Sequence, residues 1–396
     1  MGCAGSVSVN RLFGEDFIMK KLLCHIAFFV CYIVVLVGFN RALDFTKPAD
    51  YPEGFEYAKA EVVTILEENM GADPDYDYIR IGKQAFQMKL LSGPYRGKTI
   101  ETINYVTRTT PLEGTVGTRY IVGSYDGFIT SSIMSYERSG IIMVLAALFA
   151  FLVVLYGRAK GAASIAALVI TLLNVVFLFM PMLINGVPAI LAAIVVVLLS
   201  TLYTMVVLNG FCKKSLIATA CCTGCTAFAG LLAWLTGIVG NITTLNTPEV
   251  EQLLFVTEYT DFRIDNLLTA GILIASMGAV MDTCMSLVSS LFELKTQNPD
   301  MTAAQLRRSG MNIGRDIMGT MTNTLILAFV GSSLNLVVIY YMYCTPVISL
   351  INSDFILVEA LKGLVSSIAV VLSIPAATMV TAIALGKPER TDRKSR

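Results

Sequence analysis

Long apolar runs separated by short polar connections make up most of this chain after residue 140. Each run is long enough for a helix that crosses a bilayer, which needs roughly 20 apolar residues. An earlier run, 22–39, follows two lysines and lacks a small-x-small cleavage site, so it predicts an uncleaved signal anchor. The pattern predicts about eight transmembrane helices, at 22–39, 141–157, 163–181, 187–208, 216–240, 266–291, 317–340 and 360–385.

A different pattern fills the region between the first two apolar runs. Apolar and polar residues alternate within 61–66, 85–91, 100–106 and 119–122, and Gly and Pro turns separate these stretches. Such alternation is typical of half-buried strands. We expect a small antiparallel β-rich, barrel-like domain of roughly five strands. It shows no His/Cys metal spacing and no nucleophile beside a base, so we interpret it as an interaction or gating module.

These patterns together predict an α-helical polytopic membrane protein with a small extracytoplasmic β-barrel-like domain between its first two helices. Met19, Lys20 and Lys21 resemble a natural start, so residues 1–18 are either an upstream extension or part of the natural protein. The predicted parts are a cytoplasmic N-terminal segment (1–21), a signal-anchor helix (22–39), an extracytoplasmic β-rich domain (40–139), a seven-helix transmembrane domain (140–385) and a basic cytoplasmic tail (386–396).

Lys and Arg are concentrated in alternate connections between the apolar runs. They occur at 1–21, 157–161, 209–215, 293–316 and 386–396, whereas the short connections on the other side carry only Arg263. Cytoplasmic connections of membrane proteins are enriched in Lys and Arg. We therefore expect both termini in the cytoplasm and the β-rich domain outside.

Composition excludes an ordinary soluble protein. Of the 396 residues, 55% are apolar and only 15% are charged, whereas soluble domains are about 25% charged. The formal net charge of zero gives no reason to expect a nucleic-acid partner.

Cys221, Cys222 and Cys225 lie close together without a nearby His or carboxylate, so we interpret them as helix-packing residues and expect no metal and no cofactor.

Polar side chains interrupt the apolar runs 266–291 and 317–340. Residues three or four apart share a helix face, so Asp282, Ser286 and Glu293 form one stripe, and Asp316, Thr320 and Asn323 or Thr324 form another. Because the two predicted helices are consecutive and antiparallel, their stripes can meet. The candidate ion- or substrate-coupling residues are Asp282, Ser286, Glu293, Arg315, Asp316, Thr320, Asn323 and Thr324.

Asp282 has two interpretations. A carboxylate inside an apolar helix is expensive, and such residues often carry protons or ions. The structural alternative is an Asp that holds two helices together through Asn323 or Thr320. At the outer end of the last run, Glu359 and Lys362 lie one turn apart, which predicts an interfacial ion pair with Glu359 as a further candidate.

The connection between the two polar runs carries a helix-start signal. Thr302 and Gln305 fit a capping box, so we expect a short amphipathic helix from Thr302 to near Gly310. It would place Arg307, Arg308 and Arg315 at the cytoplasmic headgroups, for contact with anionic lipid or for steering of a substrate or ion.

Four stretches carry a resemblance to a known family. They are Leu91–Lys98, Gly278–Asp282 with Glu293, Ser309–Ala328, and Glu359 ahead of Ile374 and Pro375. These stretches resemble the YibE/F-like family of bacterial integral membrane proteins. The resemblance implies a multi-pass protein of the bacterial plasma membrane and no established activity. The order of Asp, acidic residue, amphipathic connection and Asn-Thr helix is also similar to that of proton-driven resistance-nodulation-division exporters.

The polar stripes favour a secondary transporter or export-assisting permease with Asp282 as the proton or cation site. Its partners would be the lipid bilayer and a small solute or ion. The alternative is a non-transporting scaffold whose outer domain binds an envelope protein. An enzyme is disfavoured: Asp282 and Asp316 would be needed as an aspartyl pair, and the Gly-x-Gly-Asp context of membrane aspartyl proteases is missing.

Overall fold

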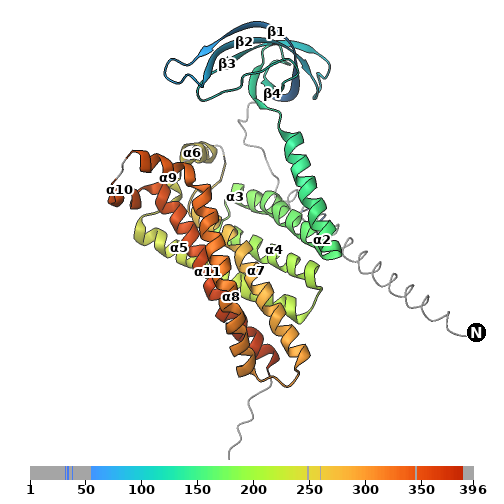
Figure 1. Cartoon of the computed structure of the whole chain (residues 1–396), viewed down its shortest axis with the longest axis vertical. Helices are drawn as coiled ribbons and strands as arrows, with labels where there is room; N and C mark the ends of the chain where they lie inside the picture. Colours follow the sequence, from blue (N-terminus) through green and yellow to red (C-terminus); the bar gives the residue numbers. More distant parts are fainter. Residues whose placement is uncertain are drawn as a thin grey trace, which may run out of the picture. The chain divides into compact units, whose positions relative to one another are not determined.

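The computed structural model describes residues 32, 34, 38, 55–247, 249–258, 260–343 and 346–386 (Figure 1). The chain divides into two compact units, Ala49–Tyr156 and the remainder. Apart from single positions, the predicted segment 1–21, the signal anchor 22–39 and the tail 386–396 lie outside the described residues.

The first unit contains a five-stranded antiparallel sheet. Its strands are β1 (Glu56–Ala72), β2 (Arg80–Leu90), β3 (Thr99–Val106), β4 (Arg119–Ser124) and β5 (Ser132–Tyr136). The order β3-β2-β1-β4-β5 leaves β3 and β5 as the edges. The predicted five-stranded antiparallel domain is therefore confirmed as a half-barrel sheet. Two irregularities in the register of β1 against β2 bend the sheet.

Alternating burial gives this sheet one packed face. Along β3 every second residue is buried, and the core contains Phe86, Met88 and Tyr120. Two polar residues also face inward and are satisfied by loop carbonyls. Thr102 Oγ1 donates to Ser131 O at 2.8 Å, and Asn104 Nδ2 donates to Leu112 O at 2.7 Å. These bonds hold the loops against the sheet, because a buried polar group without a partner is costly.

An ion pair between buried Asp73 and half-exposed Arg108 holds the turn between β1 and β2. Asp73 is only 1% exposed, and its carboxylate accepts from Arg108 Nε at 2.5 Å and Nη2 at 2.7 Å. The backbone N–H groups of Asp75 and Tyr76 donate to the same carboxylate. The hydrogen bonds from the Arg108 guanidinium are the main cause that holds the pKa of Asp73 below its ordinary value, and the backbone bonds are a smaller cause.

This ion pair predicts that the sheet loses stability in acid. A carboxyl whose pKa is lowered by folding stabilises the fold above its unfolded pKa, about 3.9, and loses that contribution as the pH falls toward the folded value. In a fragment of residues 49–138, Asp73→Asn should lower the melting temperature at pH 7 by several degrees and flatten its decline below about pH 4. Circular dichroism measures both; Asp77→Asn, at an exposed carboxylate, is the control, and equal curves for the two variants would contradict the assignment.

The second unit is helical, and α2 (Ser139–Asn174) leads into it from the first. The other helices are η1 (Val175–Phe179), α3 (Met180–Ile184), α4 (Ala189–Asn209), α5 (Lys213–Gly240), η2 (Thr244–Asn246), α6 (Val250–Glu258), α7 (Leu267–Gln297), α8 (Ala303–Ser332), α9 (Leu334–Met342), α10 (Val347–Ile351) and α11 (Asp354–Leu385). By length and composition, five helical stretches among the described residues could cross a membrane, or six if α8 and α9 form one bent span.

Two of the predicted spans lie in one kinked helical stretch. The expected spans 141–157 and 163–181 belong to a single helical stretch, Ser139–Ile184, of 46 residues. Only Arg158 leaves helical geometry, with φ 50° and ψ −132°. This kink divides the stretch into two helical arms at the place where the sequence predicted the connection between the two spans.

The capping box at Thr302 is confirmed, but the short helix predicted after it is wrong. Thr302 Oγ1 accepts from Gln305 N at 3.3 Å, and Gln305 Oε1 accepts from Thr302 N at 2.9 Å. The helix then continues through Gly310 to Ser332 and bends by 60° into α9. The predicted span 317–340 is therefore divided near Ser333.

Gly310 continues α8 because it is a packing residue and not a helix stop. A Cβ at Gly310 would lie 2.7 Å from Thr378 Cγ2, and a Cβ at Gly314 would collide with Ile374. Both contacts are with α11, so the two glycines let α8 and α11 approach closely. Helix α11 also packs against α5 and α7, and these four helices share one buried cluster (Figure 1).

The glycine contact gives a matched pair of variants on one helix. Gly314→Ala adds a methyl group against Ile374 and should destabilise the protein by about 1–3 kcal/mol through overpacking. Gly319→Ala meets open space and should be neutral or stabilising, by up to about 1 kcal/mol, because Ala favours helix. The temperature at which each detergent-solubilised variant loses its size-exclusion peak measures the difference. Equal losses for both variants would argue against close packing at Gly314.

Candidate functional site

Helix α7 has one buried face and one exposed face. Val280, Cys284 and Leu287 on the buried face are 0% exposed. The residues that the structure leaves exposed along the other face include Gly271, Ala275, Asp282, Ser286 and Glu293. A Cβ added at Gly271 would have nothing within 4 Å. The predicted Asp282, Ser286 and Glu293 therefore lie on one exposed side of α7, opposite its buried face.

Asp282 lies near the middle of this exposed stripe. It is the sixteenth residue of α7, about 22 Å along the axis at 1.5 Å per residue. Among the described residues, no hydrogen bond or ion pair is formed by its carboxyl group, and none joins it to Asn323 or Thr320. Within the described part of the chain, the bonds to Asn323 or Thr320 named by the helix-joining interpretation are not formed.

Helix α8 carries the second stripe, also on an exposed face. Its buried residues, Leu306, Gly310 and Gly314, all lie in its first half. The predicted residues Arg315, Asp316, Thr320, Asn323 and Thr324 are exposed.

The hydrogen bonds of this stripe stay within α8. Thr320 Oγ1 donates to Ile317 O at 3.0 Å, and Thr324 Oγ1 donates to Thr320 O at 2.8 Å. Among the described residues, Arg315 donates only to Asn312 Oδ1, at 3.4 Å. These polar groups are consequently available to a ligand, to lipid headgroups or to another chain.

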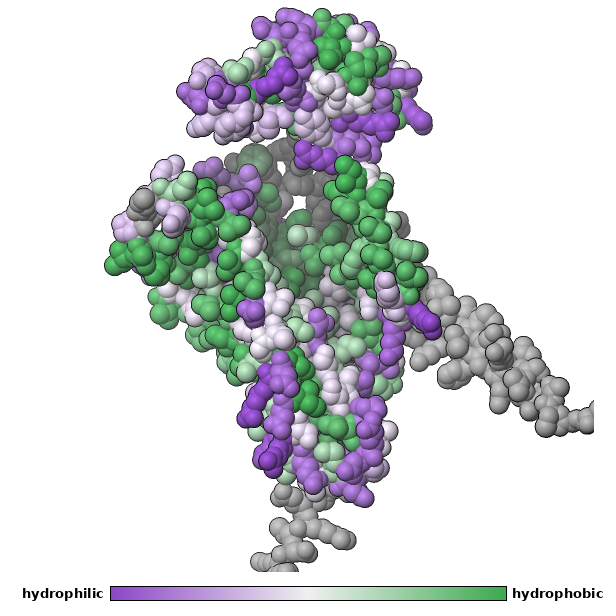
Figure 2. Space-filling model, in the orientation of Figure 1, coloured by the Kyte–Doolittle hydropathy of each residue, from purple (hydrophilic) through white to green (hydrophobic). Residues whose placement is uncertain are grey.

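The two stripes lie on neighbouring helices. Helices α7 and α8 contact each other, and α11 packs against both. Figure 2 shows hydrophilic residues gathered over the lower parts of α7 and α8. No hydrogen bond between the described residues joins the two stripes, so the structure places them on adjacent helices without pairing them.

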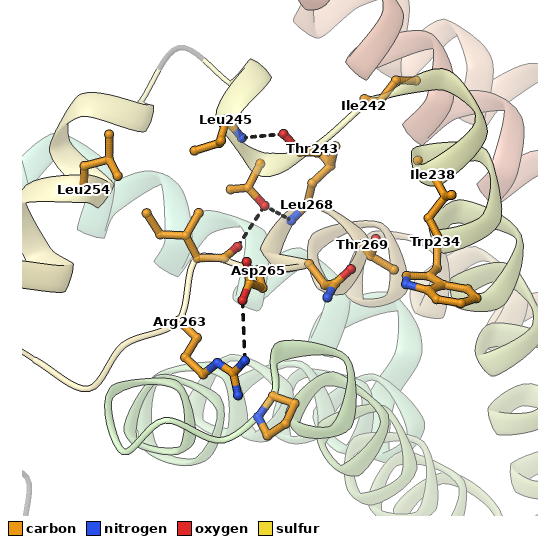
Figure 3. A pocket seen from close by; sticks show the side chains of 15 residues that line it. Trp234, Ile238, Ile242, Thr243, Leu245, Leu254, Arg263, Asp265, Leu268 and Thr269 are labelled. Carbon is orange, nitrogen blue, oxygen red and sulfur yellow. Dashed lines mark hydrogen bonds and ion pairs between the residues drawn. The ribbon is translucent and has the colours of Figure 1, made fainter.

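A pocket of about 600 Å³ lies where α5 ends and α7 begins (Figure 3). Sequence reasoning did not find it, because its walls come from separate segments. The one usable signal was Trp234, the chain's single tryptophan, close to a helix end. The lining residues are Pro188, Trp234, Gly237, Ile238, Ile242, Thr243, Thr244, Leu245, Leu254, Arg263, Ile264, Asp265, Asn266, Leu268 and Thr269.

Hydrogen bonds between polar residues hold the loop beside this pocket. Thr244 Oγ1 donates to Ile264 O at 3.0 Å and accepts from Leu268 N at 3.2 Å. Asn246 Oδ1 accepts from Thr243 N at 2.7 Å. These bonds fix the connection between α5 and α7, so the pocket has a preformed wall.

Comparison with known families decides the class of this chain. The family model described as YibE/F-like protein matches residues 145–387, which include the long apolar helices and both polar stripes. The chain belongs to the YibE/F-like family. No curated protein and no solved structure matches it. The function of the family is unknown, and the apolar helices are compatible with a membrane protein.

In this YibE/F-like protein the predicted pair of Glu359 and Lys362 is confirmed. Lys362 Nζ lies 2.6 Å from Glu359 Oε1. The pair adjoins an apolar pocket of about 280 Å³ between α8, α9 and α11, with Phe329, Val337 and Gly363 among its walls. Glu359 is therefore part of a different surface from Asp282, and its charge is already balanced.

The cysteines of the YibE/F-like helices belong to the packed core. Cys222 and Cys284 are 0% exposed, and Cys221 and Cys225 are at most 8% exposed. Among the described residues, no group of three or more His, Cys, Asp or Glu side chains is placed to hold a metal ion. These thiols accordingly contribute small apolar surfaces to the contact of α5 with α7 and α11.

Proposed function

We propose that this protein is a secondary transporter or an export-assisting permease in which a proton or small cation binds Asp282. The observation that supports the proposal is the position of Asp282: midway along an apolar helix, on an exposed stripe, and without a hydrogen-bond or ion-pair partner among the described residues. A carboxylate in such surroundings is costly unless it faces water, a cation or a proton. Small and hydroxyl residues beside it leave room for any of these.

The second stripe gives the proposed site its polar neighbours. Thr320, Asn323 and Thr324 are exposed on α8, and α8 contacts α7. Hydroxyl and amide oxygens can bind a cation or form hydrogen bonds to a solute, and both groups are uncharged. We therefore assign Asp282 the coupling role and the α8 residues a binding role for a small solute. In this proposal the reaction is transport and no enzymatic step is involved.

The proposal places the protein in a bacterial plasma membrane. The concentration of Lys and Arg in alternate connections supports cytoplasmic termini and an extracytoplasmic sheet. Arg307 and Arg308 are exposed at the start of α8 and would lie at the cytoplasmic headgroups. The lipid bilayer and a small solute or ion are then the expected partners, and the charge balance supports no nucleic-acid role.

The second candidate function is a non-transporting scaffold, and the half-barrel sheet favours it. Between β3 and the turn before β5 lies a pocket of about 470 Å³ with Glu101, Tyr105 and Ile129 among its walls. Edge strands such as β3 present unpaired backbone groups that can bind an extended segment of another protein. In this function the sheet would bind an envelope partner, and the polar stripes would carry no ion.

Proton flux through reconstituted protein tests the coupling role. In vesicles loaded with a pH-sensitive dye, an imposed membrane potential should drive proton entry through the parent protein. Asp282→Asn keeps the size of the side chain but cannot ionise, so the flux should fall to the level of empty vesicles. Glu251→Gln, which neutralises an exposed carboxylate on α6, should keep the parental flux.

Two outcomes count against the proposal. If Asp282→Asn conducts protons as well as the parent, the carboxyl is not the coupling group. If the parent protein carries no more protons than empty vesicles, the scaffold function is favoured.

A further inference from the structure

The pocket at the junction of α5 and α7 has two chemically different sides. Figure 3 shows Trp234 and Ile238 on one side, from the last turns of α5, and Arg263 and Asp265 across from them. Leu254 of α6 adds a further apolar wall. Trp234 is 40% exposed and Leu254 is 50% exposed, although each is large and apolar. The pocket therefore offers an apolar surface next to two opposite charges.

The two charges are only loosely engaged with each other. Arg263 Nη2 lies 3.6 Å from Asp265 Oδ2, and the two side chains are 61% and 75% exposed. A solvated pair at this distance contributes little. Arg263 keeps N–H donors for an anionic oxygen, and Asp265 keeps acceptor capacity for a cation.

Several polar groups of this pocket form no hydrogen bond within the described part of the chain. They are the indole N–H of Trp234, the carboxamide of Asn266 and the hydroxyl of Thr269. Asn266 precedes α7 in a left-handed conformation, φ 60°, without capping the helix through its side chain. Thr269 is only 8% exposed. Asn266 and Thr269 add hydrogen-bonding groups close in sequence to Arg263, and Trp234 adds an N–H donor on the opposite side of the pocket.

We propose that this pocket binds a zwitterionic amphiphile. The anionic oxygen of its headgroup accepts from Arg263 and from Asn266 or Thr269, its cationic group pairs with Asp265, and its chain lies against Trp234 and Leu254. A double-chain phospholipid of the bilayer and a free single-chain zwitterion share this chemistry. The site is separate from Asp282, so its occupancy does not depend on the transport proposal.

The single tryptophan of the chain makes occupancy directly measurable. Bromine atoms quench indole fluorescence at short range, so full-length protein in a non-ionic detergent is titrated with lipids that carry brominated chains. Phosphatidylcholine is compared with phosphatidic acid and diacylglycerol of the same chains, which test the zwitterionic, anionic and neutral headgroups. Brominated lysophosphatidylcholine tests the single-chain source.

Zwitterionic lipid should quench Trp234 saturably, with an affinity about tenfold higher than that of the other two headgroups. Tighter binding of phosphatidylcholine than of its lyso form assigns the site to a bilayer phospholipid, and the reverse order assigns it to a free amphiphile. Equal quenching by all three double-chain headgroups, or quenching that rises without saturation, would overturn the proposal.

Single substitutions test the assigned contacts. Arg263→Gln and Asp265→Asn should each weaken phosphatidylcholine binding about tenfold, because each removes one charge-assisted contact. Arg96→Gln, at an exposed arginine in the turn between β2 and β3, is the matched control and should bind as the parent does. Asp282→Asn should also bind normally, which separates this site from the transport proposal. Unchanged affinity in both pocket variants would show that the headgroup is not recognised there.

Discussion

The close contact of α8 with α11 is the constraint on which the arrangement of the polar stripes depends. Gly310 and Gly314 have no side chains, so Thr378 and Ile374 of α11 can pack directly against the backbone of α8. Helices α7 and α8 both pack against α11, and each leaves another face exposed. Asn323 therefore lies on the outside of the bundle because the glycine face of α8 occupies its inside, whereas Asp282 lies opposite the buried Val280, Cys284 and Leu287 of α7.

Helical periodicity in the sequence was enough to predict which residues share a stripe. Asp282, Ser286 and Glu293 do lie on one face of α7, and Thr302 does begin α8 with a capping box. Whether the stripe faces the protein interior or the outside was not predictable from periodicity. In a soluble helix the apolar face turns inward, but in a bilayer both the lipid and the protein interior are apolar. Periodicity alone therefore does not tell whether Asp282 faces a neighbour or the outside.

Other differences have equally local causes. Glycine often marks the end of a helix, but Gly310 lies within α8 because it packs against Thr378, which is 68 positions away in the sequence. The polar residues near Arg158 predicted a connection between two spans, and the structure has a kink there, at which Arg158 leaves helical geometry within the stretch Ser139–Ile184. The pocket around Trp234 joins α5, α6 and the segment before α7. Such a site exists only after the chain has folded, and no motif marks it.

Lipophilic carbodiimide labelling tests most directly whether Asp282 carries an exchangeable proton on an exposed face of the bundle. These reagents modify protonated carboxyl groups that an apolar phase can reach. The account predicts an adduct on Asp282 in membranes, found by peptide mass spectrometry, that declines as the pH is raised. Glu293, near the end of the same helix, should be modified far less. No adduct on Asp282 at any pH, or labelling that does not change with pH, would contradict the account.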